Sequence, residues 1–456
     1  MPSKRAVQEY WNVADARAAY EAASEAGMDS VREFERRFAD LVGGLDAAFA
    51  VSGRQALFGA LTLIGLEPGD GVVISAFNCT RVPDAILRRR GVPVLVDVRL
   101  PGGEIDLDEA VRVSSNGVRA ALVPHLFGIP VDCRDLAERL KKDEVTVIED
   151  CAHCLGGRIA GQMAGSVGAF SIFSFNTGKP ITLGNGGMLV CSDRRFLPEF
   201  RQLKRTWRED LSSDPERELE AIEGILKSLT AIREDMAKTP STVPVLPRKG
   251  LLQVGALRRT VAFFNRRRPD APLSHPFNEE FSPVGAVRAQ LGISLLDQWS
   301  AIESRRNENA QYLRERIGDT GLGRLYPVPS HIKPAYYQLN VYADALTPRQ
   351  VRCAIAELRR AGFRAGRWPF LPEVRHLAGY MKYASSLDNM RRMATYGFHL
   401  PIHQNLSSAD MDEIVDILLS VQKRGDWELC LTGLGQRLFG DASDRHGREA
   451  GPDGAG

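Results

Sequence analysis

The stretch at residues 145–192 constrains the fold more than any other part of the chain. Val145 to Ile148 is a short β-branched apolar run that ends in the acids Glu149 and Asp150. Such a run predicts a buried parallel strand with Asp150 at its carboxyl end. Open α/β sheets bind their ligands at that end of the strands. We therefore expect Asp150 to lie at a ligand site.

A lysine follows the next apolar run. Residues 169–175 predict a second strand, Lys179 comes soon after it, and a third run begins at Met188 after a glycine pair. A carboxylate and a lysine are thus expected at neighbouring strand ends. This pair suits pyridoxal phosphate (PLP), because the lysine amine can bond to the cofactor aldehyde while the acid keeps the ring nitrogen protonated.

Two more side chains fall near this pair. Ser174, five residues before Lys179, can donate its hydroxyl to the cofactor phosphate, and His153, three residues after Asp150, would lie over or beside the ring. Taken singly, these residues have simpler interpretations, since a strand-end Asp is often a cap and a Gly-Lys is often a solvated turn.

Three motifs in order carry a resemblance to a known family. Residues 149–153 read Glu-Asp-Cys-Ala-His, residues 173–175 read Phe-Ser-Phe ahead of Lys179, and residues 184–188 read Gly-Asn-Gly-Gly-Met. They resemble the core of the DegT/StrS family of PLP-dependent sugar aminotransferases, a branch of the fold-type I enzymes. The resemblance runs from about 31 to 421 and is poor in the middle. Asn185 departs from the acid or similar residue that is usual there.

The resemblance implies an α/β fold with a large domain, whose mostly parallel, seven-stranded-type sheet lies between helices, and a smaller C-terminal α+β domain. Alternating strands and helices over the first half also favour a mostly parallel sheet with helices on both faces. The expected parts are an N-terminal lead-in (1–28), the large PLP-binding domain (29–290, with a variable, partly basic helical insert at 196–276), a bridging helix with the small domain (291–424), and a tail (425–456) expected to be disordered from 440.

The turn after the strand predicted at 47–51 is a candidate phosphate site. Ser52, Gly53 and Arg54 lead into a helix, where exposed N–H groups and the helix dipole favour an anion. In the family this turn reads Ser-Gly-Thr and holds the cofactor phosphate. Arg54 takes the Thr position, and its guanidinium can neutralise the dianion. Whether Arg54 points to the cofactor, to a substrate phosphate or into solvent stays open.

The family also has an aromatic residue that stacks on the ring and an Asn that reaches the phosphate of the partner subunit. The aromatic position falls on Cys79, so Phe77, two residues earlier, is either the alternative stacker or a core residue. Asn278 matches the Asn when counted from Ser282 but not when counted back from Leu291. The implied arrangement is a homodimer in which each site is built from both chains.

Three further features have two interpretations each. His125 is expected to be a satisfied histidine outside the catalytic set. Trp368 lies in a loop that the family uses near its substrate, where it stacks on a sugar or base or is simply half-buried. Residues 249–268 predict a basic helix that either packs on the large domain, or meets a nucleotide pyrophosphate or a membrane surface.

Composition narrows the compartment and the partners. A net charge of +2 gives no electrostatic case for nucleic acid. No apolar run approaches the ~18 residues of a membrane span, and the first twenty residues lack a secretory core. Seven scattered cysteines indicate reduced thiols, hence a cytoplasmic location. Cys151 and Cys154 form a lone Cys-x-x-Cys without a second pair, so no metal is expected.

The resemblance implies transfer of an amino group from an amino acid, with glutamate expected, to a keto group of a nucleotide-activated sugar in amino-sugar, polysaccharide or secondary-metabolite biosynthesis. The expected catalytic residues are Lys179, Asp150 and His153. Two alternatives stay open: a fold-type I enzyme acting on a non-sugar keto substrate, and a non-catalytic PLP-binding regulator. Relatives that catalyse deoxygenation have histidine at the lysine position, so Lys179 argues against that reaction.

Overall fold

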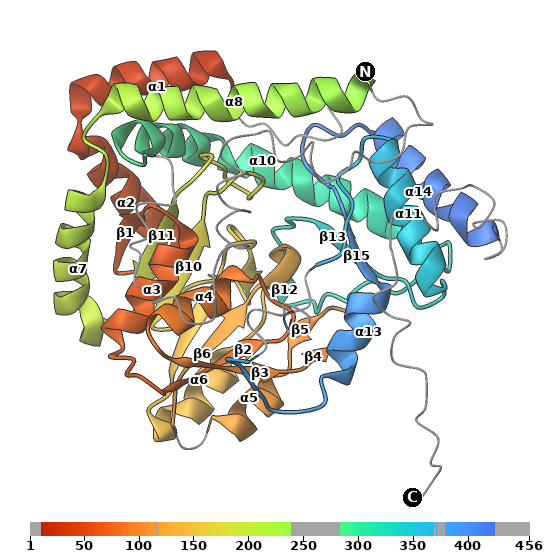
Figure 1. Ribbon diagram of the computed structural model, residues 1–456, viewed down its shortest axis with the longest axis horizontal. Helices are drawn as coiled ribbons and strands as arrows, with labels where there is room; N and C mark the ends of the chain where they lie inside the picture. The colour runs from red at the N-terminus through yellow and green to blue at the C-terminus, as the bar shows by residue number, and fades with distance from the viewer. Residues whose placement is uncertain (1–10, 115–116, 239–282, 369–370, 372–378, 425–456) are drawn as a thin grey trace, which may run out of the picture.

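The computed structural model describes residues 11–114, 117–238, 283–368, 371 and 379–424, and a large sheet lies at its centre (Figure 1). Across the sheet, the strands among these residues are β1 (Asp46–Ala50), β11 (Gly187–Cys191), β10 (Phe170–Ser174), β7 (Thr146–Asp150), β6 (Val118–Pro124), β2 (Gly71–Ser75), β3 (Val92–Val96) and β14 (Lys382–Tyr383). β11 is antiparallel to β1 and β10, and the pairings from β10 to β14 are parallel. The predicted mostly parallel sheet is confirmed.

Helices cover both faces of this sheet, as predicted. One face packs against α3 (Gly53–Leu63), α4 (Arg81–Arg88) and α7 (Leu197–Asp210). The other face packs against α5 (Leu107–Val113) and α6 (Arg134–Leu140) at one end, and against α2 (Met28–Val42) and α10 (Ala286–Gly318) at the other. With apolar side chains buried on both faces, the strands read as continuous apolar runs.

The C-terminal part has a hydrophobic cluster of its own. The second half of α10 packs there with a two-stranded sheet and two helices. These elements are β13 (Leu339–Tyr342), β15 (Gly397–Leu400), α11 (Pro348–Arg360) and α14 (Ser408–Lys423), and α13 (Asp388–Tyr396) precedes β15. Thr347 and Ser407 begin α11 and α14 with capping boxes, as their sequences predict.

Short elements complete the described chain. The remaining strands are β4 (Val98–Arg99), β5 (Glu104–Ile105), β8 (Arg158–Ile159), β9 (Gln162–Met163) and β12 (Ile332–Lys333), and the 3₁₀ turns are η2 (Leu126–Gly128), η3 (Lys141–Asp143) and η4 (Arg194–Phe196). β8 lies between β9 and β12, which joins the segment after β7 to the segment after α10.

The N-terminal segment contains a helix that the sequence patterns did not predict. α1 (Val13–Ala26) packs beside α8 (Pro215–Lys238) and α10, and the three lie together along one side of the molecule (Figure 1). α1 carries three buried alanines, a weak apolar stripe compared with that of α2. In the sequence, Asp29 and Ser30 predict a cap for the helix that continues through Val31. This prediction is wrong, since α2 begins at Met28 after Gly27 and both residues lie in its first turn.

A cluster of five phenylalanines joins α2 to the antiparallel end of the sheet: Phe34, Phe38, Phe49, Phe173 and Phe175. Phe34 is fully buried and meets Phe49 edge to face, with 5.3 Å between ring centroids. A Cβ atom on Gly292 of α10 would lie 2.5 Å from the Phe34 ring, so a glycine is needed there for α10 to approach. The aromatic cluster therefore fixes α2 and α10 on the sheet.

Replacing Phe34 by alanine is expected to lower the free energy of unfolding by about 3–5 kcal/mol, because a buried ring leaves a cavity that the rigid sheet cannot close. Urea denaturation followed by fluorescence measures the change. Val13→Ala serves as the control, since Val13 is 44% exposed and surface changes stay within about 0.5 kcal/mol. Equal midpoints for the two variants would show that the cluster does not carry this part of the stability.

Candidate active site

Asp150 and Lys179 come from adjacent parallel strands, as the sequence predicts. Asp150 ends β7 and pairs with Ile172 of β10, and Lys179 follows β10 after a turn closed by its N–H to the carbonyl of Asn176. Asp150 is only 8% exposed. Burial raises the pKa of this carboxyl, although the Ala152 N–H and the nearby charge of Lys179 act in the opposite direction.

The Asp150 carboxylate retains hydrogen-bonding capacity. Oδ1 accepts the Ala152 N–H at 3.0 Å, and no second donor to this side chain occurs among the described residues. A buried carboxylate held by one hydrogen bond is costly unless a cationic donor joins it. The protonated ring nitrogen of PLP is such a donor, so Asp150 fits the cofactor that its position predicted.

Aromatic rings surround His153. Its imidazole stacks on Tyr337 with 4.3 Å between centroids and 31° between planes, and it meets Trp368 edge to face at 4.9 Å. Lys179 Nζ lies 5.6 Å from the centroid of Tyr337. The structure thus brings together the three predicted catalytic residues, with Tyr337 and Trp368 from the C-terminal part.

His153 is neutral in this setting. Burial, followed by the charge of Lys179, holds the pKa of its imidazole well below the usual 6.5. Nδ1 is buried without a hydrogen-bond partner among the described residues. At this position, Nδ1 is a buried polar atom that a ligand beside Asp150 and Lys179 would complete.

The predicted phosphate contacts also converge. Ser52 caps α3, its Oγ accepting the Gln55 N–H at 3.1 Å. A Cβ on Gly53 would lie 3.0 Å from Cβ of Ser174, so the end of β10 touches the first turn of α3. Gly187 is equally constrained, since its Cβ would lie 2.4 Å from the Gly53 nitrogen. The two glycines thus let β10 and β11 pack closely on the first turn of α3, and a helix start of this kind favours an anion such as the cofactor phosphate.

Arg54 has a defined direction. Its guanidinium, 4% exposed, forms an ion pair with Asp84 of α4, and Arg88 lies 3.5 Å from the same carboxylate. The structure therefore excludes the interpretation that this side chain points into solvent. Asp84 lies 30 residues away in the sequence, which is why the local pattern did not indicate the pair.

Phe77 and Cys79 take different positions. Phe77 is 2% exposed and packs in the core, 6.0 Å from the Phe127 ring and against Gly103. Cys79 is half-buried and packs against the same core. Asn278 and residues 249–268, with their predicted phosphate and basic contacts, lie outside the described residues.

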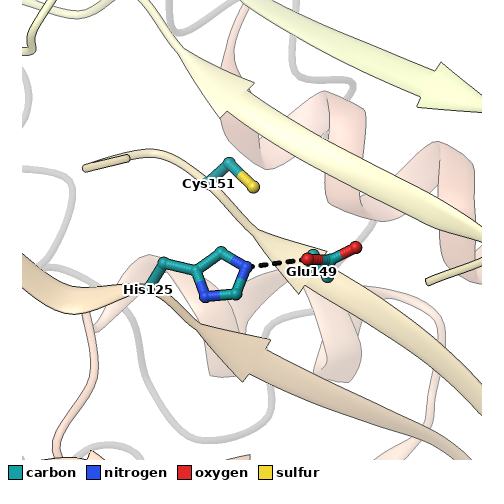
Figure 2. Close-up of side chains that lie close together, drawn as sticks. All are labelled: His125, Glu149 and Cys151. Carbon is teal, nitrogen blue, oxygen red and sulfur yellow. Dashed lines mark hydrogen bonds and ion pairs between the residues drawn. The ribbon is translucent and has the colours of Figure 1, made fainter. Parts of the chain in front are cut away.

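A buried cluster beside Asp150 was not predicted as a unit (Figure 2). His125 Nε2 donates to Glu149 Oε2 at 2.9 Å, while His125 Nδ1 accepts the Val131 N–H at 3.0 Å. Glu149 Oε2 also accepts the Gly165 N–H at 2.8 Å, and Oε1 accepts the N–H groups of residues 167 and 168, each at 2.7 Å. His125 is thus a satisfied histidine, as expected.

The cluster includes the Cys151 thiol, and these three side chains lie close enough to bind a metal ion. However, Glu149 already accepts four hydrogen bonds, and the Val131 N–H occupies the free nitrogen of His125. Burial raises the pKa of the Cys151 thiol well above 9.0, which keeps it protonated. The donors and acceptors of this cluster already form hydrogen bonds within the protein. We therefore interpret the cluster as structural rather than as a metal site.

The fold places the chain in a class. A DegT/DnrJ/EryC1/StrS aminotransferase from Brucella abortus aligns with a TM-score of 0.65 at 17% identity, over 90% of this chain and 96% of that one. The GDP-4-keto-6-deoxy-D-mannose-3-dehydratase of E. coli, solved with bound hydrated PLP, aligns with a TM-score of 0.66 at 16% identity, over 91% and 98%. The protein therefore has the fold-type I architecture that its sequence resemblance implies.

Sequence comparison points to the same family. The model of the DegT/DnrJ/EryC1/StrS aminotransferase family matches residues 13–216, which is less than half of the chain. Over 164 residues, the chain is 31% identical to the GDP-perosamine synthase of Escherichia coli O157:H7, which covers 36% of this chain and 45% of the relative. The chain thus matches less than half the length of that relative. Across the described helices, none is long and apolar enough to cross a membrane.

Replacing Glu149 by glutamine is expected to lower the free energy of unfolding by at least about 2 kcal/mol, because the amide group would face N–H donors. Burial alone would raise the pKa of Glu149, but His125 and the N–H groups lower it below its usual 4.5. The carboxylate therefore stabilises the fold above about pH 4.5 and loses this effect as the pH falls through the lowered pKa. Urea denaturation from pH 7 to pH 3 should give a flatter pH profile for Glu149→Gln.

Glu138→Gln is the matched control, since the side chain of Glu138 is 72% exposed in a surface ion pair with Lys141. Such pairs contribute at most about 1 kcal/mol. Equal stability and equal pH profiles for the two variants would contradict a structural role for Glu149.

Proposed function

We propose that the protein is a PLP-dependent aminotransferase that moves an amino group from an amino acid, with glutamate as the donor, to a keto group of a nucleotide-activated sugar. The single observation that carries the proposal is the convergence of Lys179, Asp150 and His153 at the carboxyl ends of β7 and β10. The family match over 13–216 and the name of the perosamine synthase support the sugar acceptor.

Each of the proposed site residues has a separate role, which follows from its position. When bound, PLP supplies a ring that withdraws electrons from the carbon bearing the substrate amine. Asp150 would hold the ring nitrogen in its protonated form, and His153 with Tyr337 would flank the ring. Ser52, Gly53 and Ser174 would bind the phosphate at the start of α3. Lys179 Nζ would move a proton from the donor α-carbon to the C4′ carbon of the cofactor, and in the second half-reaction from C4′ to the acceptor carbon.

Lys179 also separates this proposal from a dehydratase. The fold alone does not, because the E. coli dehydratase shares it. Relatives that remove a hydroxyl group have histidine at the lysine position, whereas this chain retains an amine that can carry a proton twice in each catalytic cycle. Aminotransfer requires that amine, since the donor and the acceptor in succession exchange a proton with the same cofactor carbon, C4′.

The proposal extends to assembly and location. Because the resemblance implies an Asn supplied by a partner subunit, we propose a homodimer with shared sites, located in the cytoplasm. Light scattering coupled to size exclusion measures the mass of the particle directly. A monomer with full activity would remove the homodimer from the proposal without affecting the role of Lys179.

Replacing Lys179 by alanine is expected to abolish covalent capture of PLP and to reduce turnover by at least about 100-fold, as loss of a positioned proton carrier does. Borohydride reduction followed by peptide mass spectrometry should find the cofactor mass at position 179 in the wild type. Lys333→Ala is the control, because the Lys333 side chain is 63% exposed and outside the cluster of Lys179.

The loaded wild type should lose its cofactor absorbance on titration with glutamate and regain it with a nucleotide ketosugar. Recovery with a non-sugar ketone alone would favour the alternative substrate class. Absence of any response to amino acids would favour a regulator. A protein that takes up no PLP would contradict the whole proposal.

A further inference from the structure

Arg364 lies at the site, although the sequence gives no local sign of it. The residue follows α11 on the segment that continues to Trp368, and it is exposed. A Cβ atom on Gly178 would lie 2.6 Å from Arg364 Nη1, so the guanidinium lies against the backbone of Gly178. Gly178 directly precedes Lys179. The C-terminal part therefore delivers a cation beside the proposed catalytic lysine.

Arg364 has no ion-pair partner among the residues that the structure describes. Within the described ranges, no carboxylate lies within ion-pair distance of Arg364, whereas Arg324 pairs with Asp344 and Arg424 with Glu357 in the same part of the chain. His399 is close by and neutral, since burial, then the charges of Arg364 and Arg359, lower its pKa to about 3. A cation without a counter-ion, held against the Gly178 backbone and close to the buried His399, attracts an anion.

We propose that Arg364 determines specificity by binding an anionic oxygen group of the substrate, a carboxylate or a phosphate. The guanidinium is a planar fork that donates two parallel hydrogen bonds to either group. The inference rests on the proposed function, because that function brings both kinds of anion to Lys179. The carboxylate belongs to the amino donor, and the phosphate belongs to the nucleotide of the acceptor.

The position beside Gly178 limits how the anion lies. A group held by Arg364 is adjacent to the lysine backbone, on the side of the C-terminal segment that also presents Trp368 to His153. Trp368 and Arg364 together offer an aromatic edge and a cation from a single segment. This combination selects a substrate that carries its negative charge close to the reacting carbon or on a nearby diphosphate.

The test compares Arg364→Gln and Arg364→Lys with wild type, each loaded with PLP. Calorimetric titration with glutarate and, separately, with inorganic pyrophosphate measures anion affinity without catalysis. Loss of a charge-assisted hydrogen bond typically weakens binding by about 10-fold or more. Arg364→Gln should show this loss for one probe, and Arg364→Lys a smaller loss, because the charge remains and the fork is removed.

Arg367→Gln is the matched control. Arg367 is an exposed arginine of the same segment, and its Nη1 donates to the Ala394 carbonyl at 3.3 Å, toward α13. It should bind both probes like the wild type. Weakened glutarate binding in Arg364→Gln identifies the carboxylate, and weakened pyrophosphate binding identifies the phosphate.

Two results would overturn the inference: unchanged affinity of Arg364→Gln for both probes, or a loaded wild type that binds neither. Both leave the covalent link at Lys179 intact, so they are distinct from failure of the proposed function, in which that link does not form.

Discussion

The site depends on the hydrogen bonds that the buried carboxylate of Glu149 accepts. It is fully inaccessible to water and accepts hydrogen bonds from the β6 end at His125 and from the turn at residues 165–168 that leads into β10. β7 carries Glu149 itself, and Asp150 is the next residue. One side chain thus holds three adjacent chain segments in register at the edge where the predicted catalytic groups lie. A charge buried this deeply is tolerated because its hydrogen-bonding capacity is filled.

Asp150 and His153, close to Glu149 in the sequence, are buried with incomplete hydrogen bonding. Burial shifts the pKa of both groups toward the neutral form, upward for the acid and downward for the imidazole. Without a ligand, these groups carry unsatisfied capacity in a low-dielectric setting. This unfavourable desolvation lies next to Glu149 and His125, whose hydrogen bonds are complete. Neighbouring residues therefore have contrasting roles. Glu149 holds the structure, and Asp150 keeps the hydrogen-bonding capacity that the proposed cofactor would use.

The parts of this fold that could be predicted are those set by local signals. Asp106, Thr347 and Ser407 each begin a helix because a side-chain oxygen close to the N–H groups of the first turn is a local property. The strands around Asp150 and Lys179 were predictable because buried parallel strands are continuous apolar runs. The cap expected for α2 failed because Asp29 and Ser30 lie inside a helix that begins after Gly27.

The unpredicted parts of the site come from distant partners. Asp84 meets Arg54 across 30 positions, and Tyr337 meets His153 across more than 180. Arg364 lies on a segment whose sequence resembles any exposed turn, and only the tertiary contact with Gly178 reveals its place. No periodicity or spacing encodes such contacts, since they depend on how the C-terminal part docks on the sheet.

That docking includes a backbone connection. β14 adds to the edge of the central sheet beside β3, and the side chain of Asp97 accepts the N–H groups of Asn389 and Met390 at the start of α13. The family match ends at residue 216, whereas the sheet is completed only by residues 382–383. A protein truncated to the matched segment would leave β3 as a bare edge, whose unpaired peptide groups invite pairing between chains. Residues 13–216 produced alone would therefore be prone to aggregation through this edge.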